Sequence, residues 1–219
     1  MPSDCASKLK AGSVDLALVP VALIPELETH FIETDFCIGA NGKVDSVKLY
    51  SEVPIEKIET VMMDYQSRTS NALAKILFEK HWNKSVDFLP SHPGFESQVS
   101  GTVAAVVIGD RCFGLNGKFN YEYDLAEEWK TLSGLPFVFA AWVSRHRLDK
   151  KFITEFNKVL MRGIKNIAAS VQSPENRSSI GSGRVMRYLT QNISYDLNDE
   201  KKKGLELFLN YLKEKKNAN

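Results

Sequence analysis

The sequence has 219 residues, 43% of them apolar and 25% charged, and its 28 basic and 27 acidic residues leave a formal charge of +1. This balance excludes a global field that would attract nucleic acid or an anionic membrane, and the apolar share suffices for one domain or two small lobes. No apolar run approaches the roughly 18 residues that a membrane helix needs, and residues 1–12 lack the apolar segment of a signal peptide.

The beginning of the chain predicts a helix followed by two strands. Residues 3–11 form a helical pattern that ends near Gly12. The unbroken apolar run over 14–21 is typical of a strand covered on both faces, as in a parallel sheet. Gly39 and the pair Asn41-Gly42 are turn signals, and a second strand is predicted directly after them.

The middle of the chain alternates strands with a helix. Strands are predicted over 58–64, 85–90 and 102–110, and a helix over 67–80 follows the first of them. This order indicates βαβ units and a parallel sheet. A middle block that can close on its own, entered and left by extended segments, predicts two lobes with a ligand cleft between them. We expect residues 1–54 and 138–219 to form one lobe and residues 55–137 to form the other.

The last third of the chain predicts two helices around a buried strand, and then further helices. Residues 124–132 begin with a capping box that pairs Asp124 with Glu127, and the run over 135–143 is apolar enough for a buried strand. Helical periodicity resumes at residue 149.

Three strand ends carry the residues that we expect to bind a ligand, because ligands of open α/β sheets lie beyond the carboxyl ends of the strands. The three cysteines and four histidines have no metal-binding spacing, and nucleotide-binding and hydrolase motifs are absent from the sequence, so no metal is expected. The candidate residues are Pro20 and Val21 after the first strand, Ser67, Thr69 and Ser70 after the second, and Gly109 and Asp110 after the third.

The turn of residues 67–70, SRTS, gathers three hydroxyls at the start of a helix. The first backbone N–H groups of a helix lack internal partners, and the helix dipole adds partial positive charge there, so the turn predicts a pocket for a carboxylate or phosphate. The alternative is that Ser67 or Ser70 only caps the helix and Arg68 is solvated. Asp110, similarly, either accepts from a ligand hydroxyl or caps the next turn, and Pro20 either exposes its carbonyl or only ends a strand.

Six stretches of the sequence together resemble the chorismate dehydratase family of the futalosine route to menaquinone. The resemblance runs nearly from end to end, and six segments in the right order are more specific than any one motif. They are VDLALVPVALIPEL (14–27), CIGANGKVDSVKLYS (37–51), DYQSRTSNALAKIL (64–77), VVIGDRCF (106–113), YDLAEEWKTLSGLPFVFAAWV (123–143) and ISYDL (193–197).

This resemblance implies a fold similar to type II periplasmic binding proteins, with two α/β lobes around a cleft. It implies a cytoplasmic lyase, without metal or organic cofactor, that dehydrates the dianion chorismate to 3-[(1-carboxyvinyl)oxy]benzoate. No residue stands out as a general base, so a substrate carboxylate is a candidate to take the proton. On this reading Thr69, Ser70 and helix N–H groups hold one carboxylate, Gly109, Asp110, Pro20 and Val21 line the opposite side, and Ser46 faces the pocket.

Two features leave alternatives open. Family members usually open with a strand and a polar turn resembling S-Y-x-N, and this chain starts after that unit, so we expect a shortened chain or an altered function. The sheet edge exposed in its absence would be covered in a homodimer or by strand exchange. The alternative functions are 1,4-dihydroxy-6-naphthoate synthase of the same route and a non-catalytic cytosolic binder of small carboxylates.

Overall fold

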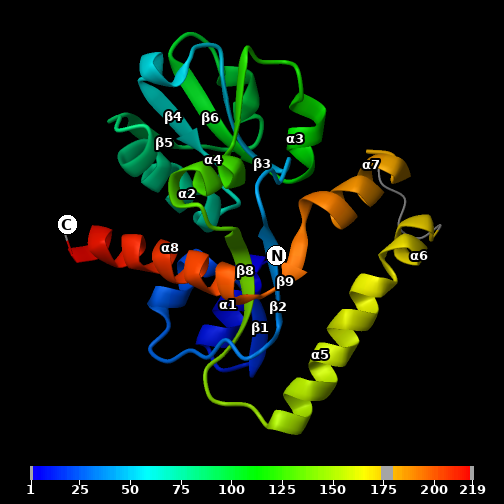
Figure 1. Cartoon of the computed structure of the whole chain (residues 1–219). Helices are drawn as coiled ribbons and strands as arrows, with labels where there is room; N and C mark the ends of the chain where they lie inside the picture. The colour runs from blue at the N-terminus through cyan, green and yellow to red at the C-terminus, as the bar shows by residue number, and fades with distance from the viewer. Residues whose placement is uncertain (1, 174–179, 218–219) are drawn as a thin grey trace. The chain divides into compact units, whose positions relative to one another are not determined.

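The computed structural model describes residues 2–173 and 180–217 (Figure 1). The chain divides into two compact units, the first made of Met1–Ala40 with Phe137–Asn219 and the second of Asn41–Pro136. Each unit contains one sheet. The chain enters the second unit after residue 40 and not after residue 54, because strand β3 (Val47–Ser51) pairs with β6 and β7 of the second sheet.

The sheet of the first unit has the order β1-β8-β2-β9, and every neighbouring pair in it is antiparallel. The parallel sheet expected from the apolar run over 14–21 is therefore wrong for this unit. The side chains of β1 alternate between buried and half-buried, so one face of the strand packs into the core more closely than the other. The strands are β1 (Leu16–Pro20), β2 (Phe36–Ala40), β8 (Phe137–Ser144) and β9 (Ser194–Asp196).

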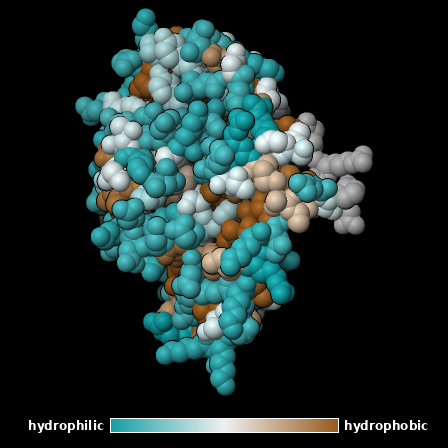
Figure 2. Space-filling model, turned by 45° about the vertical axis from the view of Figure 1, so that its right-hand side comes forward, coloured by the Kyte–Doolittle hydropathy of each residue, from teal (hydrophilic) through white to brown (hydrophobic). Residues whose placement is uncertain are grey.

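The helices of the first unit differ in how closely they pack. α8 (Asp199–Asn217) lies on the sheet, where the ring of Phe208 meets that of Phe137 edge to face at 5.1 Å between centroids. α5 (Lys150–Lys165) is amphipathic but has no buried residue, and Figure 2 shows apolar surface on the side that carries it. The remaining helices are α1 (Pro2–Lys10), the 3-10 helix η1 (Val21–Glu26), α6 (Ile167–Gln172), α7 (Ser182–Arg187) and the π-helix η6 (Tyr188–Asn192).

The second unit holds a mixed sheet of order β5-β4-β6-β3-β7. β5, β4 and β6 are parallel, as the alternation of strands and helix predicts, while β3 runs antiparallel to both β6 and β7. β7 was not predicted from the sequence. The strands of this sheet other than β3 are β4 (Thr60–Met63), β5 (Asp87–Pro90), β6 (Val103–Ile108) and β7 (Tyr121–Asp124).

Helices cover both faces of the second sheet. Tyr50, Met62 and Val107 share one face with Phe95 of η4 and Cys112 of α3. Because side chains alternate along a strand, their neighbours point to the other face, on which α2 and α4 pack. The helices are η2 (Ile55–Lys57), α2 (Arg68–Ile76), which continues into the π-helix η3 (Leu77–His81), η4 (Phe95–Gln98), α3 (Asp110–Leu115) and α4 (Leu125–Ser133).

Candidate functional site

One edge of the second sheet collects most of the predicted site residues. β4, β5 and β6 are parallel and β3 is antiparallel to them, so the carboxyl ends of the first three strands and the beginning of β3 lie at the same edge. Hydrogen bonds join these ends directly. The Gly109 N–H donates to the Ser46 carbonyl at 2.8 Å, and Ser91 Oγ donates to the Met63 carbonyl at 2.7 Å. Pro20 and Val21 belong to the sheet and to η1 of the first unit.

The SRTS turn begins α2 with a hydroxyl cap. Ser67 is the extended residue before the helix, and its Oγ accepts from the Ser70 N–H at 3.1 Å. The same Oγ lies 2.8 Å from Ser70 Oγ, so the two hydroxyls share a hydrogen bond. Thr69 and Ser70 are each only 2% exposed, whereas Ser67 is half-buried and Arg68 is exposed. The capping interpretation therefore holds for Ser67, and this turn presents Ser67 and Arg68 to the surface.

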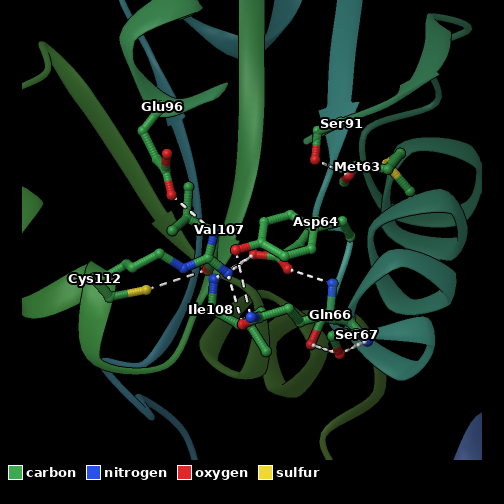
Figure 3. A network of polar contacts seen from close by, with 12 residues as sticks. Met63, Asp64, Gln66, Ser67, Ser91, Glu96, Val107, Ile108 and Cys112 are labelled. Carbon is green, nitrogen blue, oxygen red and sulfur yellow. Dashed lines mark hydrogen bonds and ion pairs between the residues drawn. The ribbon is translucent and has the colours of Figure 1, made fainter. Parts of the chain in front are cut away.

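Asp64, directly after β4, connects several of these strand ends (Figure 3). Its side chain is fully buried, and its carboxylate accepts from the Gln66 N–H at 2.8 Å and from the Ile108 N–H, at the end of β6, at 3.0 Å. Arg111 Nη2 donates to the same carboxylate at 2.5 Å. The Asp64 carbonyl accepts from Asn71 Nδ2 at 2.8 Å, which ties α2 to the same point.

Arg111, in the first turn of α3, is held from several sides. Its second amino group donates to Glu96 Oε1 at 2.8 Å, and its guanidinium lies over the rings of Tyr65 and Phe95, 5.1 and 5.6 Å from their centroids. Such cation–π contacts fix the plane of a guanidinium as well as its position. The side chain is 27% exposed, so this cation reaches the surface of the edge while Asp64 does not.

The pKa values of Asp64 and Arg111 each depend on burial and on the opposite charge of the partner. Burial raises the pKa of Asp64, while the Gln66 N–H, the Arg111 guanidinium and the Ile108 N–H lower it and leave a smaller net rise. Burial works against the charge of Arg111, but Asp64 and Glu96 outweigh it and raise the pKa of Arg111. The guanidinium thus stays charged beside the strand ends.

The third predicted strand end has the backbone conformation that glycine favours. Gly109 has a φ of 69°, and open space surrounds the position of an added Cβ, so the backbone of this residue is approachable. Asp110 is exposed and begins α3. Ser46 is 5% exposed and lies next to Gly109 through the backbone hydrogen bond.

Asp64 and Arg111 lie within two of the strand ends that the sequence indicates, but neither they nor Asn71 were predicted as binding residues. A signal for Asp64 existed, because a carboxylate directly follows a buried strand. Asn71 Oδ1 is buried and has no hydrogen-bond partner among the residues that the structure describes, which leaves an acceptor beside the start of α2. Nothing in the local sequence indicates that Arg111 pairs with a residue 47 positions away.

Among the residues that the structure describes, no group of three His, Cys, Asp or Glu side chains is placed to hold a metal ion. Within the same ranges, no helix has the length and hydropathy to cross a bilayer. Two surface cavities, of about 300 and 240 Å³, lie in the first unit and contain none of the predicted site residues.

Comparison with known proteins identifies the family. A profile described as menaquinone biosynthesis matches residues 1–214. This chain belongs to the menaquinone biosynthesis family. Among curated members of similar sequence, the chorismate dehydratase of Campylobacter jejuni is 27% identical over 212 residues, which make up 95% of this chain and 80% of the relative. The chorismate dehydratase of Thermus thermophilus is 23% identical over 228 residues, 95% of this chain and 83% of the relative. The predicted family resemblance is confirmed.

Solved structures confirm the fold class of this family member. An Archaeoglobus fulgidus protein superposes with a TM-score of 0.69 at 15% identity and covers 100% of this chain and 85% of its own. The alkanesulfonate-binding protein of Xanthomonas axonopodis pv. citri, solved with MOPS, gives a TM-score of 0.57 at 13% identity, covering 96% of this chain and 78% of its own. At these identities the likeness concerns the fold alone, which is that of periplasmic binding proteins.

Proposed function

We propose that this chain is a chorismate dehydratase, a lyase that removes water from chorismate to give 3-[(1-carboxyvinyl)oxy]benzoate. The observation that carries the proposal is the match, over 95% of the chain, to two curated proteins with that name. The reaction makes an aromatic ring, which supplies its driving force, so the protein needs chiefly to hold a dianion and assist the loss of a proton and a hydroxide. The three cysteines are unpaired, which fits a cytoplasmic enzyme.

The edge of the second sheet offers suitable groups for one substrate carboxylate. Ser67 lies half-buried at the positive end of the α2 dipole, and the cation of Arg68 is exposed beside it. Thr69 and Ser70 support that turn from the buried side. Gly109, Asp110 and Ser46 continue the proposed binding edge, while the roles of Pro20 and Val21, which belong to the first unit, stay predictions from the sequence. No described side chain there is assigned as the base, so we propose that a substrate carboxylate takes the proton.

The test is turnover of chorismate by the purified chain. We expect the absorbance of the cyclohexadiene to disappear and an aromatic enol-ether acid of mass lower by one water to appear in mass spectrometry. The double substitution Thr69→Ala with Ser70→Ala should raise KM and lower kcat, because it removes two hydroxyls at the start of α2. The matched control is Ser97→Ala on η4, an exposed serine whose hydroxyl donates to the nearby Gly94 carbonyl. Kinetics unchanged by the double substitution would contradict the assignment of Thr69 and Ser70.

A non-catalytic binder of small carboxylates is a second candidate, because a structural neighbour is a solute-binding protein. The same experiment separates the candidates. A binder would retain chorismate unchanged in equilibrium dialysis. A 1,4-dihydroxy-6-naphthoate synthase would leave chorismate alone and act on a cyclised futalosine derivative.

A further inference from the structure

We propose that Arg111 is a positioning residue, which through Asp64 locks the SRTS turn to the end of β6 so that both present one rigid surface to the substrate. This inference rests on the proposed function. Arg111 is not assigned contact with the substrate. It acts by fixing the groups that make that contact.

The first support is the way in which Asp64 connects separate segments. Its one carboxylate accepts from the backbone of the β4–α2 turn at Gln66 and from the last residue of β6, Ile108. Its backbone carbonyl holds Asn71 of α2. A displacement of Asp64 would therefore move the cap of α2 and the approach to Gly109 together.

The second support is the number of contacts that hold the Arg111 guanidinium in place. Two carboxylates, one amide oxygen and two aromatic rings hold its guanidinium: Asp64, Glu96, Gln66 at 3.3 Å, Tyr65 and Phe95. Carboxylates on two sides of a planar donor leave it little freedom to rotate, and only a guanidinium offers both the fork and the stacking plane. This is the geometry of a clamp that positions other groups.

The third support is location. The Asp64–Arg111 pair joins the ends of two parallel strands, at the edge where ligands of α/β sheets bind. A misplacement of binding groups by about 1 Å can cost about a hundredfold in rate, so a clamp at this edge affects catalysis without touching the substrate.

The test compares Arg111→Met, Arg111→Lys and a matched control in steady-state kinetics with chorismate. We expect Arg111→Met to raise KM about tenfold, less than the roughly hundredfold that a displacement of about 1 Å can cost. Arg111→Lys should be intermediate, because it keeps the charge beside Asp64 but loses the fork and the stacking plane. The control Arg147→Met removes a guanidinium that bonds Glu33 at 3.1 Å and lies over the Phe31 ring at 4.7 Å in the first unit, and it should leave KM unchanged.

A purely structural role would reduce the folded fraction, and thus the apparent kcat, but leave KM unchanged. A wild-type KM in Arg111→Met would therefore overturn the inference. Hydrogen exchange of the unliganded protein gives a readout independent of turnover. Exchange over 64–71 and 105–110 should rise together in Arg111→Met and stay unchanged in Arg147→Met.

Failure of the proposed function looks different from failure of this inference. If the wild-type chain neither dehydrates nor binds chorismate, the proposed function fails while the coupled rise in exchange still supports the clamp. If either segment exchanges as in the wild type, the clamp is refuted whatever the activity.

Discussion

Two ion pairs, one in each unit, bury opposite members of the pair. In the second unit the carboxylate of Asp64 is fully buried and its partner Arg111 is 27% exposed. In the first unit the ammonium of Lys201 is 1% exposed and the Asp196 side chain is 58% exposed, with 2.9 Å between Nζ and Oδ1. Lys201 Nζ also donates to Ser194 Oγ and to the Asp196 carbonyl, so its three protons have three acceptors.

The pKa values of the two carboxylates move in opposite directions for this reason. Burial raises the pKa of Asp64, and its donors recover only part of that rise. Burial also raises the pKa of Asp196, but the hydrogen bonds from Lys201 and Ser194 outweigh it and leave the pKa lowered. The member of an ion pair that is removed from water therefore determines the energetic cost of the pair, because its charge must be satisfied by the protein alone.

The largest effect should follow from leaving Lys201 buried without its partner. We expect Asp196→Ala to lower the free energy of unfolding by about 3 kcal/mol, the lower end of the cost of a buried unpaired charge, because two neutral acceptors remain. Urea unfolding at neutral pH measures this. Since the folded-state pKa of Asp196 is lowered, its contribution is present above the ordinary value of 3.8 and is lost as the pH falls through the folded-state value.

The control for that prediction removes the buried charge itself. Lys201→Met should cost less than Asp196→Ala, because the remaining Asp196 carboxylate is exposed to water and no charge is left buried. A larger cost for Lys201→Met would show that the contacts of the long side chain, and not its charge, determine the stability of this region.

A smaller effect is expected in the second unit. Arg111→Met should lower the free energy of unfolding by about 2 kcal/mol at neutral pH, because Asp64 keeps two backbone donors. Without Arg111 the pKa of Asp64 rises further. A raised folded-state pKa favours the native state below the unfolded value of 3.8, and this advantage is lost as the pH rises, so the deficit should grow from acid to neutral pH.

The double variant Asp64→Asn with Arg111→Met isolates that titration. In urea unfolding followed at several pH values, the added pH dependence of Arg111→Met should disappear in the double variant. If the added pH dependence persists in the double variant, a group other than Asp64 is responsible for it. The proposed difference between the two ion pairs, in which Asp64 has a raised pKa and Asp196 a lowered one, would then be wrong.

The sequence allowed the second unit to be predicted better than the first. Apolar runs separated by a helical pattern indicate parallel strands, and β5, β4 and β6 pair in that way. An equally apolar run became β1, whose partner β8 runs antiparallel. Periodicity reports burial but not the direction of the partner strand. β7 was missed because its sequence, YEYD, is polar and lies at the end of the sheet order.

In the candidate site, contacts between residues close in the sequence could be predicted, whereas contacts between residues distant in the sequence could not. The Ser67 cap could be predicted, because it depends on residues within three positions of each other. Asp64 and Arg111 are 47 residues apart in the sequence, so their pairing could be found only from the tertiary structure. Asp196 and Lys201 are close in the sequence, and the start of α8 brings their side chains together. The burial of Thr69 and Ser70 also depends on how α2 packs on the sheet, which the hydroxyl pattern does not encode.

The smallest effect should come from an ion pair in which neither member is buried. On α5, Lys158 Nζ lies 2.7 Å from Glu155 Oε1, a shorter distance than in the Asp196–Lys201 pair, yet the two side chains are 66% and 70% exposed. If distance governed stability, Lys158→Ala would cost more than Asp196→Ala. If burial governs, water replaces the pair at little cost, and we expect a change of less than about 0.5 kcal/mol in urea unfolding that vanishes in high salt. A loss of more than about 1 kcal/mol in the free energy of unfolding would contradict the conclusion that burial of one member determines what an ion pair contributes.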